Sequence, residues 1–568
     1  MILAVGSIII ARFLGPSSYG LYVLTLLMPS LLVSLADAGM SYALVRLPAK
    51  LRSENDYSGA NRTVRLGFLL KTSLSVTAFL ICYGGAEAIA ATVLNRPELA
   101  PFVRLASTVI VFQALFDAAN SSFIGLDLVQ YTASMQILES VLKSVLAPTL
   151  ILLGFGLVGA ISGHIVSYVA AGLTGAVILL LRHTHPAANA HSRMNDSSSA
   201  ELRVLLGYGL PLYLAALLAV FLSQYQSIVL AHFAANVEIG NFNAAWNFNM
   251  LLMILVYPIT TAMLPMFSKM SPENQRSEIA RAFTLVVKYA SLIMIPASVG
   301  VMVFSRDLIL LTYGRDYTFA AQYLIILGGL YLLTAAGYLV LGSFLSGLAD
   351  TRTVLVMSAL TLVIYLPLGP TLTWLWGPYG LLIAFVFSNA ASTLWGVRRV
   401  SVKFGTGPDL GASGRILLAA LAAAVPVMAL IQLHLTGIGL VNLVAGGCLY
   451  LLAYLTLTPI VGAVDKFDMM NLRTILSYVI SQHYVEVEMR FVALTDLDQN
   501  RLAQNILEIA TLEGNILGPT LIRSQTRLET QDRNKTTRAW AVTARIVEML
   551  SRPVFDYEER LLSAMGRG

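Results

Sequence analysis

Residues 135–154 read MQILESVLKSVLAPTLILLG, and residues 157–181 read LVGAISGHIVSYVAAGLTGAVILLL. Glu139 and Lys143 are the only acidic or basic residues in these two runs, apart from His164. A helix of about 20 apolar residues crosses roughly 30 Å of hydrocarbon. The two runs therefore predict consecutive membrane helices, joined by the short turn GFG.

The same pattern recurs along the chain. Of its 568 residues, 57% are hydrophobic and only 12% are charged, whereas about a quarter of a soluble protein is charged. We predict an all-α polytopic membrane protein with about fourteen transmembrane helices. The predicted spans are 1–14, 20–45, 64–91, 101–120, 135–154, 157–181, 204–232, 241–265, 284–304, 320–346, 353–374, 379–397, 416–433 and 438–460.

The first predicted span is short. It has about 14 residues, against the roughly 20 needed to cross a bilayer. We expect either a start further upstream or a truncated helix. The segment lacks the basic leader and small-residue cleavage site of a signal peptide.

The connections between spans differ in charge. Those after spans 2, 6, 8 and 12 are rich in Lys and Arg, while most odd-numbered connections, such as FLGPSSYG and WGPYG, are short and poor in Lys. Because basic connections stay in the cytoplasm, we predict that the even-numbered ones are cytoplasmic. We expect the protein in the cytoplasmic membrane. Because fourteen crossings return the chain to the side on which it started, both termini are then predicted to be cytoplasmic.

The spans divide into two sets of six and a remaining pair. We predict an N-terminal six-helix lobe at 1–181, a cytoplasmic inter-lobe loop at 182–203 and a C-terminal six-helix lobe at 204–400. Accessory helices follow at 401–462. ARFLGPSSYGLYVL in the first half and AHFAANVEIGNFNAAW in the second occupy matching places, which is typical of transporters built from two repeats.

The last part of the chain has another composition. Residues 463–568 hold 13 basic and 14 acidic residues, out of 37 and 31 in the whole chain. We predict a charged, mainly helical, soluble tail on the cytoplasmic side.

Four stretches, taken in order and with this number of spans, resemble the polysaccharide-unit (Wzx-type) flippases of the multidrug/oligosaccharidyl-lipid/polysaccharide exporter superfamily. They lie at 11–46, which opens ARFLGPSSYG, at 207–246, at 257–270 and at 304–333. The resemblance implies two six-helix lobes around a central cavity, two accessory helices and alternating access. It also implies export of lipid-linked (polyprenyl pyrophosphate) oligosaccharides for surface polysaccharide or glycan biosynthesis.

Lys143 is the strongest candidate for contact with cargo. It lies near the middle of its span, where ionisable residues are costly and therefore functional candidates, and Glu139 precedes it by one turn. At this spacing the two side chains can form an ion pair along the helix, which is the structural alternative. A lysine facing a wet cavity would instead attract the pyrophosphate of a lipid-linked sugar.

Three further charged residues are cavity candidates near the N-terminus. Asp37 lies beside Gly39 and is expected to form a hydrogen bond between helices. Arg46 and Arg12 end their spans, where an arginine either anchors the helix at the interface or meets phosphate at the cavity mouth. Two other side chains are expected to be structural. Asp117 is expected at the interface between membrane and water, and His164 within the helix bundle.

Spans 7 and 8 are rich in amides and aromatic residues, which suit sugar hydroxyls and rings as well as ordinary contacts between helices. The cavity candidates here are Gln226, Asn243, Trp246 and Asn247. Relatives often carry an acidic residue in span 7, where this chain has Gln226, and this departure puts the energy source in question.

Other functions remain open. A small-molecule antiporter and a peptidoglycan-precursor flippase belong to the same superfamily, and a membrane scaffold is a further alternative. No Walker motif is visible, so we expect a transporter and not an enzyme, with no cofactor and no metal. Cys82 and Cys448 are far apart and do not predict a disulfide. The expected partners are the lipid-linked oligosaccharide, membrane lipids and glycan-assembly proteins, and no nucleic acid.

Overall fold

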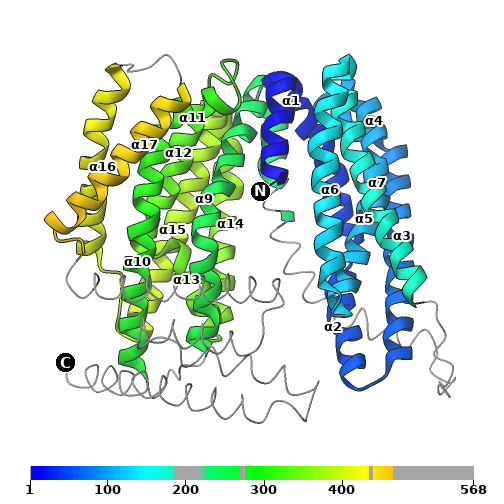
Figure 1. Ribbon diagram of the computed structural model, residues 1–568, viewed down its shortest axis with the longest axis horizontal. Helices are drawn as coiled ribbons and strands as arrows, with labels where there is room; N and C mark the ends of the chain where they lie inside the picture. Colours follow the sequence, from blue (N-terminus) through cyan, green and yellow to red (C-terminus); the bar gives the residue numbers. More distant parts are fainter. Residues whose placement is uncertain are drawn as a thin grey trace, which may run out of the picture. The chain divides into compact units, whose positions relative to one another are not determined.

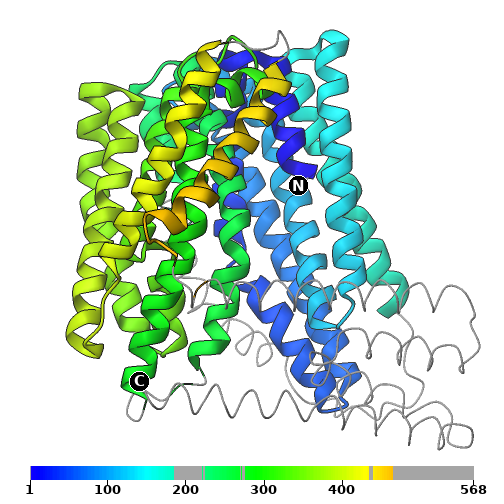
Figure 2. The same ribbon diagram turned by 60° about the vertical axis from the view of Figure 1, so that its left-hand side comes forward.

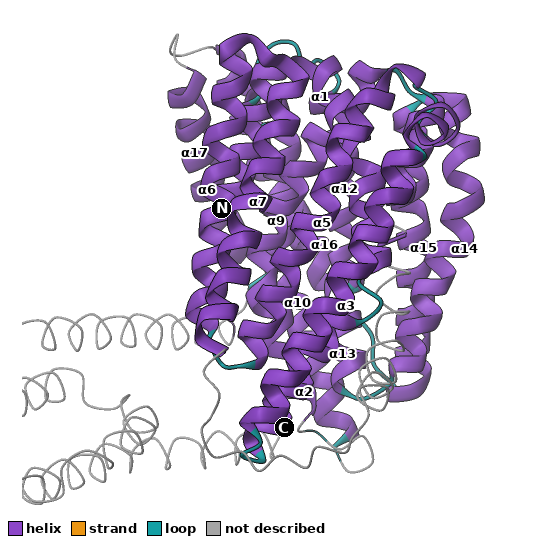
Figure 3. Ribbon diagram, turned by 90° about the vertical axis from the view of Figure 1, so that its right-hand side faces the viewer, coloured by secondary structure: helices purple, strands orange, loops and turns teal. Residues whose placement is uncertain are grey.

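All regular elements in the part of the chain that the structure describes are helices (Figure 3). The computed structural model describes residues 2–183, 220–221, 224–268, 270, 275–433, 439–464 and 468. Met1–Ala463 form one unit, and Val464–Gly568 form a second. The predicted charged tail and most of the predicted inter-lobe loop therefore lie outside the described residues.

Residues 2–183 form an N-terminal group of helices, which pack on one another (Figure 1). Its helices are α1 (Ile2–Ala36), α2 (Met40–Ser53), α3 (Tyr57–Gly84), α4 (Ala86–Ala88), α5 (Ala100–Gly125), α6 (Val129–Leu150) and α7 (Gly156–His183). α1 is kinked at Gly15, whose φ of 71° is left-handed and favours glycine. The π-helical turn η1 (Ile89–Val93) and the 3-10 turn η2 (Pro97–Leu99) connect α4 to α5, and the π-helical turn η3 (Ile151–Phe155) joins α6 to α7.

The C-terminal group consists of the helical segment 224–233 and the helices that follow it. They are α9 (Asn236–Ser268), α10 (Arg276–Val303), α11 (Ser305–Thr312), α12 (Ala320–Leu332), the 3-10 turn η4 (Leu333–Ala336), α13 (Tyr338–Gly347), α14 (Thr351–Trp376) and α15 (Pro378–Phe404). Two more helices, α16 (Leu410–Leu433) and α17 (Gly439–Ile460), pack together, and α16 lies against α10 (Figure 2).

Nine helical stretches of described residues are long and apolar enough to cross a membrane. A tenth is the bent pair Ala320–Ala336 and Tyr338–Gly347, if it counts as one span. Two of the nine stretches, Leu3–Ser53 and Val129–Leu179, have 51 residues each, more than twice the roughly 20 that one crossing needs. The polytopic helical fold is confirmed, while the count of fourteen stays a prediction.

The outer faces of the helices are apolar. Trp374, Leu181 and Ile460 are 71%, 68% and 75% exposed, and large exposed apolar surfaces are unusual in soluble monomers. Contact with lipid explains them. The largest buried cluster instead joins α1, the segment 224–233 and α9, so the two helix groups share one apolar core.

The connections lie at two opposite ends of the helices (Figure 1). We call them the α11 end, with the connections at 85–99, 234–235, 313–319 and 377, and the α2 end, with those at 54–56, 126–128, 348–350 and 405–409. These two sets are the odd- and even-numbered connections of the sequence. Charged residues lie in three places: around Asp37, around Lys143, and where the two helix groups meet at the α11 end.

Candidate functional site

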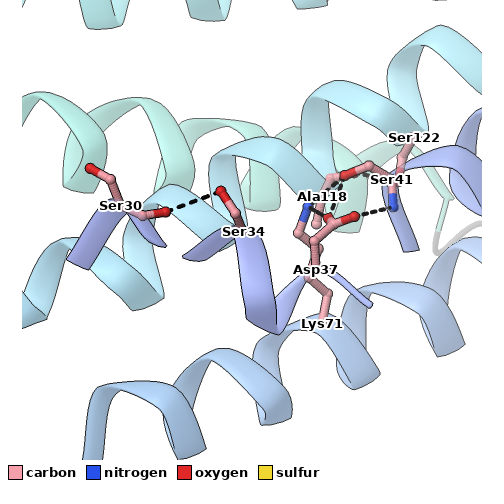
Figure 4. Close-up of polar contacts among 7 residues, drawn as sticks. All are labelled: Ser30, Ser34, Asp37, Ser41, Lys71, Ala118 and Ser122. Carbon is pink, nitrogen blue, oxygen red and sulfur yellow. Dashed lines mark hydrogen bonds and ion pairs between the residues drawn. The ribbon is translucent and has the colours of Figure 1, made fainter. Parts of the chain in front are cut away.

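The Asp37 carboxylate lies in a break between α1 and α2. The break is a turn at 37–39, where Ala38 and Gly39 have left-handed φ angles of 45° and 81°. Lys71 Nζ on α3 lies 2.5 Å from Asp37 Oδ1. The Ser41 hydroxyl accepts from Lys71 Nζ at 2.7 Å and donates to Asp37 Oδ1 at 2.6 Å. Asp37 thus joins helices through an ion pair and a hydroxyl, beyond the single hydrogen bond expected (Figure 4).

Lys71 was not predicted as a site residue, although its side chain is only 1% exposed. It lies within the predicted span 64–91, so the rule that ionisable residues in spans are functional candidates would have found it. Asp117 on α5 is half-buried and lies within electrostatic reach of Lys71 and Asp37. It therefore belongs to this charge cluster, and its expected position at the membrane interface stays a prediction.

Glu139 and Lys143 lie one turn apart on α6, beside His164 of α7. Glu139 is buried, and its Oε1 has no hydrogen-bond partner in the described part of the chain. Lys143 is half-buried and makes no hydrogen bond and no ion pair within 4.0 Å to a described residue. Its charge acts on both Glu139 and His164. The close ion pair expected as the structural alternative is thus not formed between the described side chains.

Two tyrosines lie beside His164 and within electrostatic reach of Glu139. The Tyr22 hydroxyl on α1 lies 3.4 Å from His164 Nδ1, and the Tyr168 ring centroid lies 5.2 Å from that of His164. His164 is buried, in keeping with the expected bundle histidine. The result is a second polar patch in the N-terminal group, with one incompletely bonded carboxylate and one cation. Incompletely bonded buried polar groups are uncommon and call for an explanation.

Three predicted amide and aromatic residues are engaged within the C-terminal group. Gln226 is buried beside Tyr365, and Asn243 Nδ2 donates to the Ile239 carbonyl of its own helix at 2.9 Å. The Trp246 ring stacks on Phe242, with centroids 5.9 Å apart. These contacts do not test whether the three residues line a cavity, and that role stays a proposal.

Asn247 connects the two helix groups. Its Nδ2 donates to Tyr19 Oη on α1 at 3.1 Å and to Tyr313 Oη at 3.3 Å. Arg12 on α1 also reaches across, because Nη1 donates to the carbonyls of Leu311 and Thr312 at 2.8 and 3.3 Å. These are free carbonyls at the C-terminus of α11, which attract cations. Arg12 therefore binds backbone carbonyls in this structure, and its contact with phosphate stays a prediction.

The two helix groups meet backbone to backbone where α1 crosses α9. A Cβ added to Gly20 would overlap the backbone oxygen of Asn236, and one added to Gly240 would overlap that of Pro16. Glycine is required at both positions because backbone touches backbone. The crossing joins the two segments that echo each other in sequence.

Arg46 lies apart from these contacts. It is exposed on α2, in the half of the helix that runs toward the α2 end. Among the described residues no group of three or more His, Cys, Asp or Glu side chains is placed to hold a metal ion. The predicted candidates thus form two buried charge clusters in the N-terminal group and a set of contacts between groups at the α11 end.

Known proteins resemble this chain in sequence and in fold. A probable low-salt glycan biosynthesis flippase of Haloferax volcanii, Agl15, is 24% identical over 206 residues, which are 36% of this chain and 41% of that protein. The match thus spans less than half of that relative. The lipid II flippase MurJ in an inward closed conformation has a TM-score of 0.66 at 15% identity, over 81% of this chain and 96% of that one.

A second fold relative is an inward-facing multidrug resistance MATE family transporter of the MOP superfamily. Its TM-score is 0.58 at 21% identity, over 71% of this chain and 95% of that one. These likenesses establish the fold. A family described as "Polysaccharide biosynthesis protein" matches residues 9–322, and the match covers more than half of the chain. The chain therefore belongs to this polysaccharide biosynthesis protein family.

Proposed function

We propose that this protein moves lipid-linked oligosaccharide units across the cytoplasmic membrane. Two observations about its relatives support this: the chain belongs to a polysaccharide biosynthesis family, and Agl15 is named as a glycan biosynthesis flippase. The polytopic helical fold supplies the required setting. The protein is a transporter in this proposal and changes no covalent bond in its cargo.

The state of Lys143 carries the proposal. A half-buried ammonium inside an apolar helix bundle is unfavourable unless an anion or hydrogen-bond acceptors compensate it. Its side chain has no such contact among the described residues, and Glu139 acts on it from more than 4.0 Å away. A pyrophosphate would supply the missing anion, with charge-assisted hydrogen bonds.

Two tyrosines beside His164 suit the rest of such a cargo. Tyr22 and Tyr168 offer hydroxyls next to aromatic faces, which can bond sugar hydroxyls and pack against sugar rings. Glu139 would weaken anion binding by its negative charge. We therefore assign Lys143 the cargo role and Glu139 the role of limiting its affinity, so that the cargo can leave.

The two helix groups form the moving parts in this proposal. They are the lobes at 1–181 and 204–400, with accessory helices at 401–462, and they alternate between opening at the α2 end and at the α11 end. The basic connections favour a cytoplasmic α2 end. Because Arg12, Asn247 and the Gly20–Gly240 crossing fasten the α11 end, cargo enters from the α2 end in this state.

A transport assay separates this function from drug export. Purified full-length protein in proteoliposomes is given a short polyprenyl-pyrophosphate oligosaccharide, the free oligosaccharide, or a cationic dye. The proposal expects transfer of the lipid-linked sugar alone. Transfer of the dye without the lipid-linked sugar would contradict it and favour the antiporter.

A further inference from the structure

The contacts that fasten the α11 end occur in reciprocal pairs. Arg12 of the N-terminal group donates to the Thr312 carbonyl of the C-terminal group. His232 of the C-terminal group places Nε2 3.1 Å from the Thr92 carbonyl of the N-terminal group. Each residue of the second half lies 220 positions after its counterpart, 12 with 232 and 92 with 312. Gly20 and Gly240 obey the same offset at the helix crossing.

A second pair of contacts has acceptors at equivalent positions and donors one residue out of register. Tyr317 Oη donates to the Ala11 carbonyl at 2.5 Å. Arg96 Nη1 donates to the Ala231 carbonyl at 3.2 Å, and Ala231 lies 220 positions after Ala11. Side chains of each group thus bind backbone carbonyls of the other. We call these contacts of Arg12, Arg96, His232 and Tyr317 the carbonyl latch.

The two halves of the carbonyl latch differ at one pair of equivalent positions, where Arg12 corresponds to His232. Arginine, at position 12, is a permanently charged residue type, whereas histidine, at the equivalent position 232, is the residue type that commonly serves as a proton switch. Both ring nitrogens of His232 face oxygens that can only accept: Nδ1 lies 3.0 Å from the Ile228 carbonyl, and Nε2 lies 3.1 Å from the Thr92 carbonyl. A neutral imidazole has one N–H, while the protonated ring has two.

The His232 ring can exchange a proton with solvent. The ring is exposed at the α11 end. The charged side chains on the elements that meet here are Arg96 and Glu98 from the connection 94–99 and Glu238 from α9. Arg96 donates to the carbonyls of Ala231 and Ala234, on either side of His232.

We propose that His232 is a proton-binding site that controls closure of the α11 end. The protonated ring completes the carbonyl latch and holds the two helix groups together. Loss of the proton removes one of the two N–H donors and loosens the latch. In a protein that works by alternating access, the function proposed above on which this inference rests, acid at the α11 end then favours the state open at the α2 end.

Distances between spin labels test this directly. Labels are placed at Ala88→Cys and Thr318→Cys, exposed positions on the two groups at the α11 end, with Cys448→Ser to remove the exposed native cysteine. The full-length protein in proteoliposomes is measured at pH 5.5 and 8.0. We expect the ratio of long to short distances to rise about tenfold with pH, the effect of losing one charge-assisted hydrogen bond.

A matched variant comes from the other half of the molecule. His232→Arg installs the residue that Arg12 provides at the equivalent place, so it should keep the short distance at both pH values. His164→Gln, in the interior of the N-terminal group, should keep the wild-type pH response. A pH response that persists in His232→Arg, or one that disappears only in His164→Gln, would overturn the inference, as would a wild-type protein with no response.

Transport in the same proteoliposomes separates this inference from the proposed function. If lipid-linked oligosaccharide is not moved but the distances follow the charge of His232, the function fails and the proton site stands. If transport occurs while the distances ignore pH, the proton site fails alone.

Discussion

Lys71 Nζ lies 2.5 Å from Asp37 Oδ1, and the hydroxyl of Ser41 bonds to both groups inside the N-terminal group (Figure 4). The pair ties α3 to the break between α1 and α2. Removing one partner of a buried pair leaves a charge without compensation, which costs about 3–5 kcal/mol. This relationship gives the first prediction.

Lys71→Met should lower the thermal unfolding midpoint strongly, as measured on detergent-purified protein. Asp37→Asn with Lys71→Met should restore part of the loss, because neither partner of the ion pair is then left charged and only the half-buried Asp117 lacks its cation. Lys50→Met is the matched control, since Lys50 pairs with Glu54 on an exposed surface and such pairs contribute about 0–1 kcal/mol. Equal effects of Lys71→Met and Lys50→Met would contradict a structural role for the buried pair.

Gly20 should set how closely the two groups approach at the α11 end. A Cβ there would overlap the Asn236 carbonyl oxygen, so Gly20→Ala must separate α1 from α9. We expect a longer distance between labels at 88 and 318, together with slower transport. Gly329→Ala is the control, because nothing lies within 4 Å of its added Cβ. An unchanged distance in Gly20→Ala would argue against backbone contact at the crossing.

Asp350 should stabilise the C-terminal group in a pH-dependent way. Burial raises the pKa of its carboxyl, but hydrogen bonds from Lys403 and Thr353 outweigh burial and lower the pKa below its ordinary value. The ionised form is therefore favoured by folding, and its contribution is present above about pH 4, the ordinary value for Asp. It is lost as the pH falls through the lower value in the folded protein.

Asp350→Ala should consequently cost about 1 kcal/mol at pH 7, the usual effect of losing a helix N-cap. Below pH 4 the gap in unfolding midpoint between the variant and the wild type should shrink. A gap that widens in acid would show that the carboxyl does not act through its ionised form.

The two ends of the helices should face opposite sides of the membrane. With Cys448→Ser as background, Thr318→Cys should react with an impermeant maleimide on intact cells, and Ser53→Cys should react only after lysis. Both positions are exposed. The basic connections predict this sidedness, and labelling of Ser53→Cys from outside would reverse it. Protease access to residues 480–568 from outside would do the same.

Hydropathy predicted many of the helices, but not always the residues at which they begin and end. The predicted span 157–181 nearly coincides with α7, Gly156–His183, whereas the predicted span 64–91 is α3, Tyr57–Gly84. α3 starts earlier because Asp56 caps it, accepting from the Gly59 amide, and a polar first turn does not register as apolar. The run 85–93 then breaks into a short helix and a π turn.

The candidate site could be predicted from the sequence where its residues belong to a single helix. Glu139 and Lys143 share a helix, and their spacing could be read from the sequence. Contacts between distant segments could not: Arg12 meets Leu311 across 299 positions, and Lys71 is 34 positions from Asp37. Only the offset between the repeated segments hinted at the latch, and it gave no indication that His232 would face two carbonyl oxygens.

Transport by Lys143 variants tests the central proposal most directly. Full-length protein in proteoliposomes is compared as wild type, Lys143→Ala and Lys143→Arg, with a short polyprenyl-pyrophosphate oligosaccharide as cargo and with monodispersity checked for each. Loss of a charge-assisted bond of about 1.5–3 kcal/mol predicts transfer at least about tenfold slower in Lys143→Ala. Lys143→Arg, which keeps the charge, should retain most of the rate. Wild-type transfer by Lys143→Ala would contradict the role assigned to this lysine.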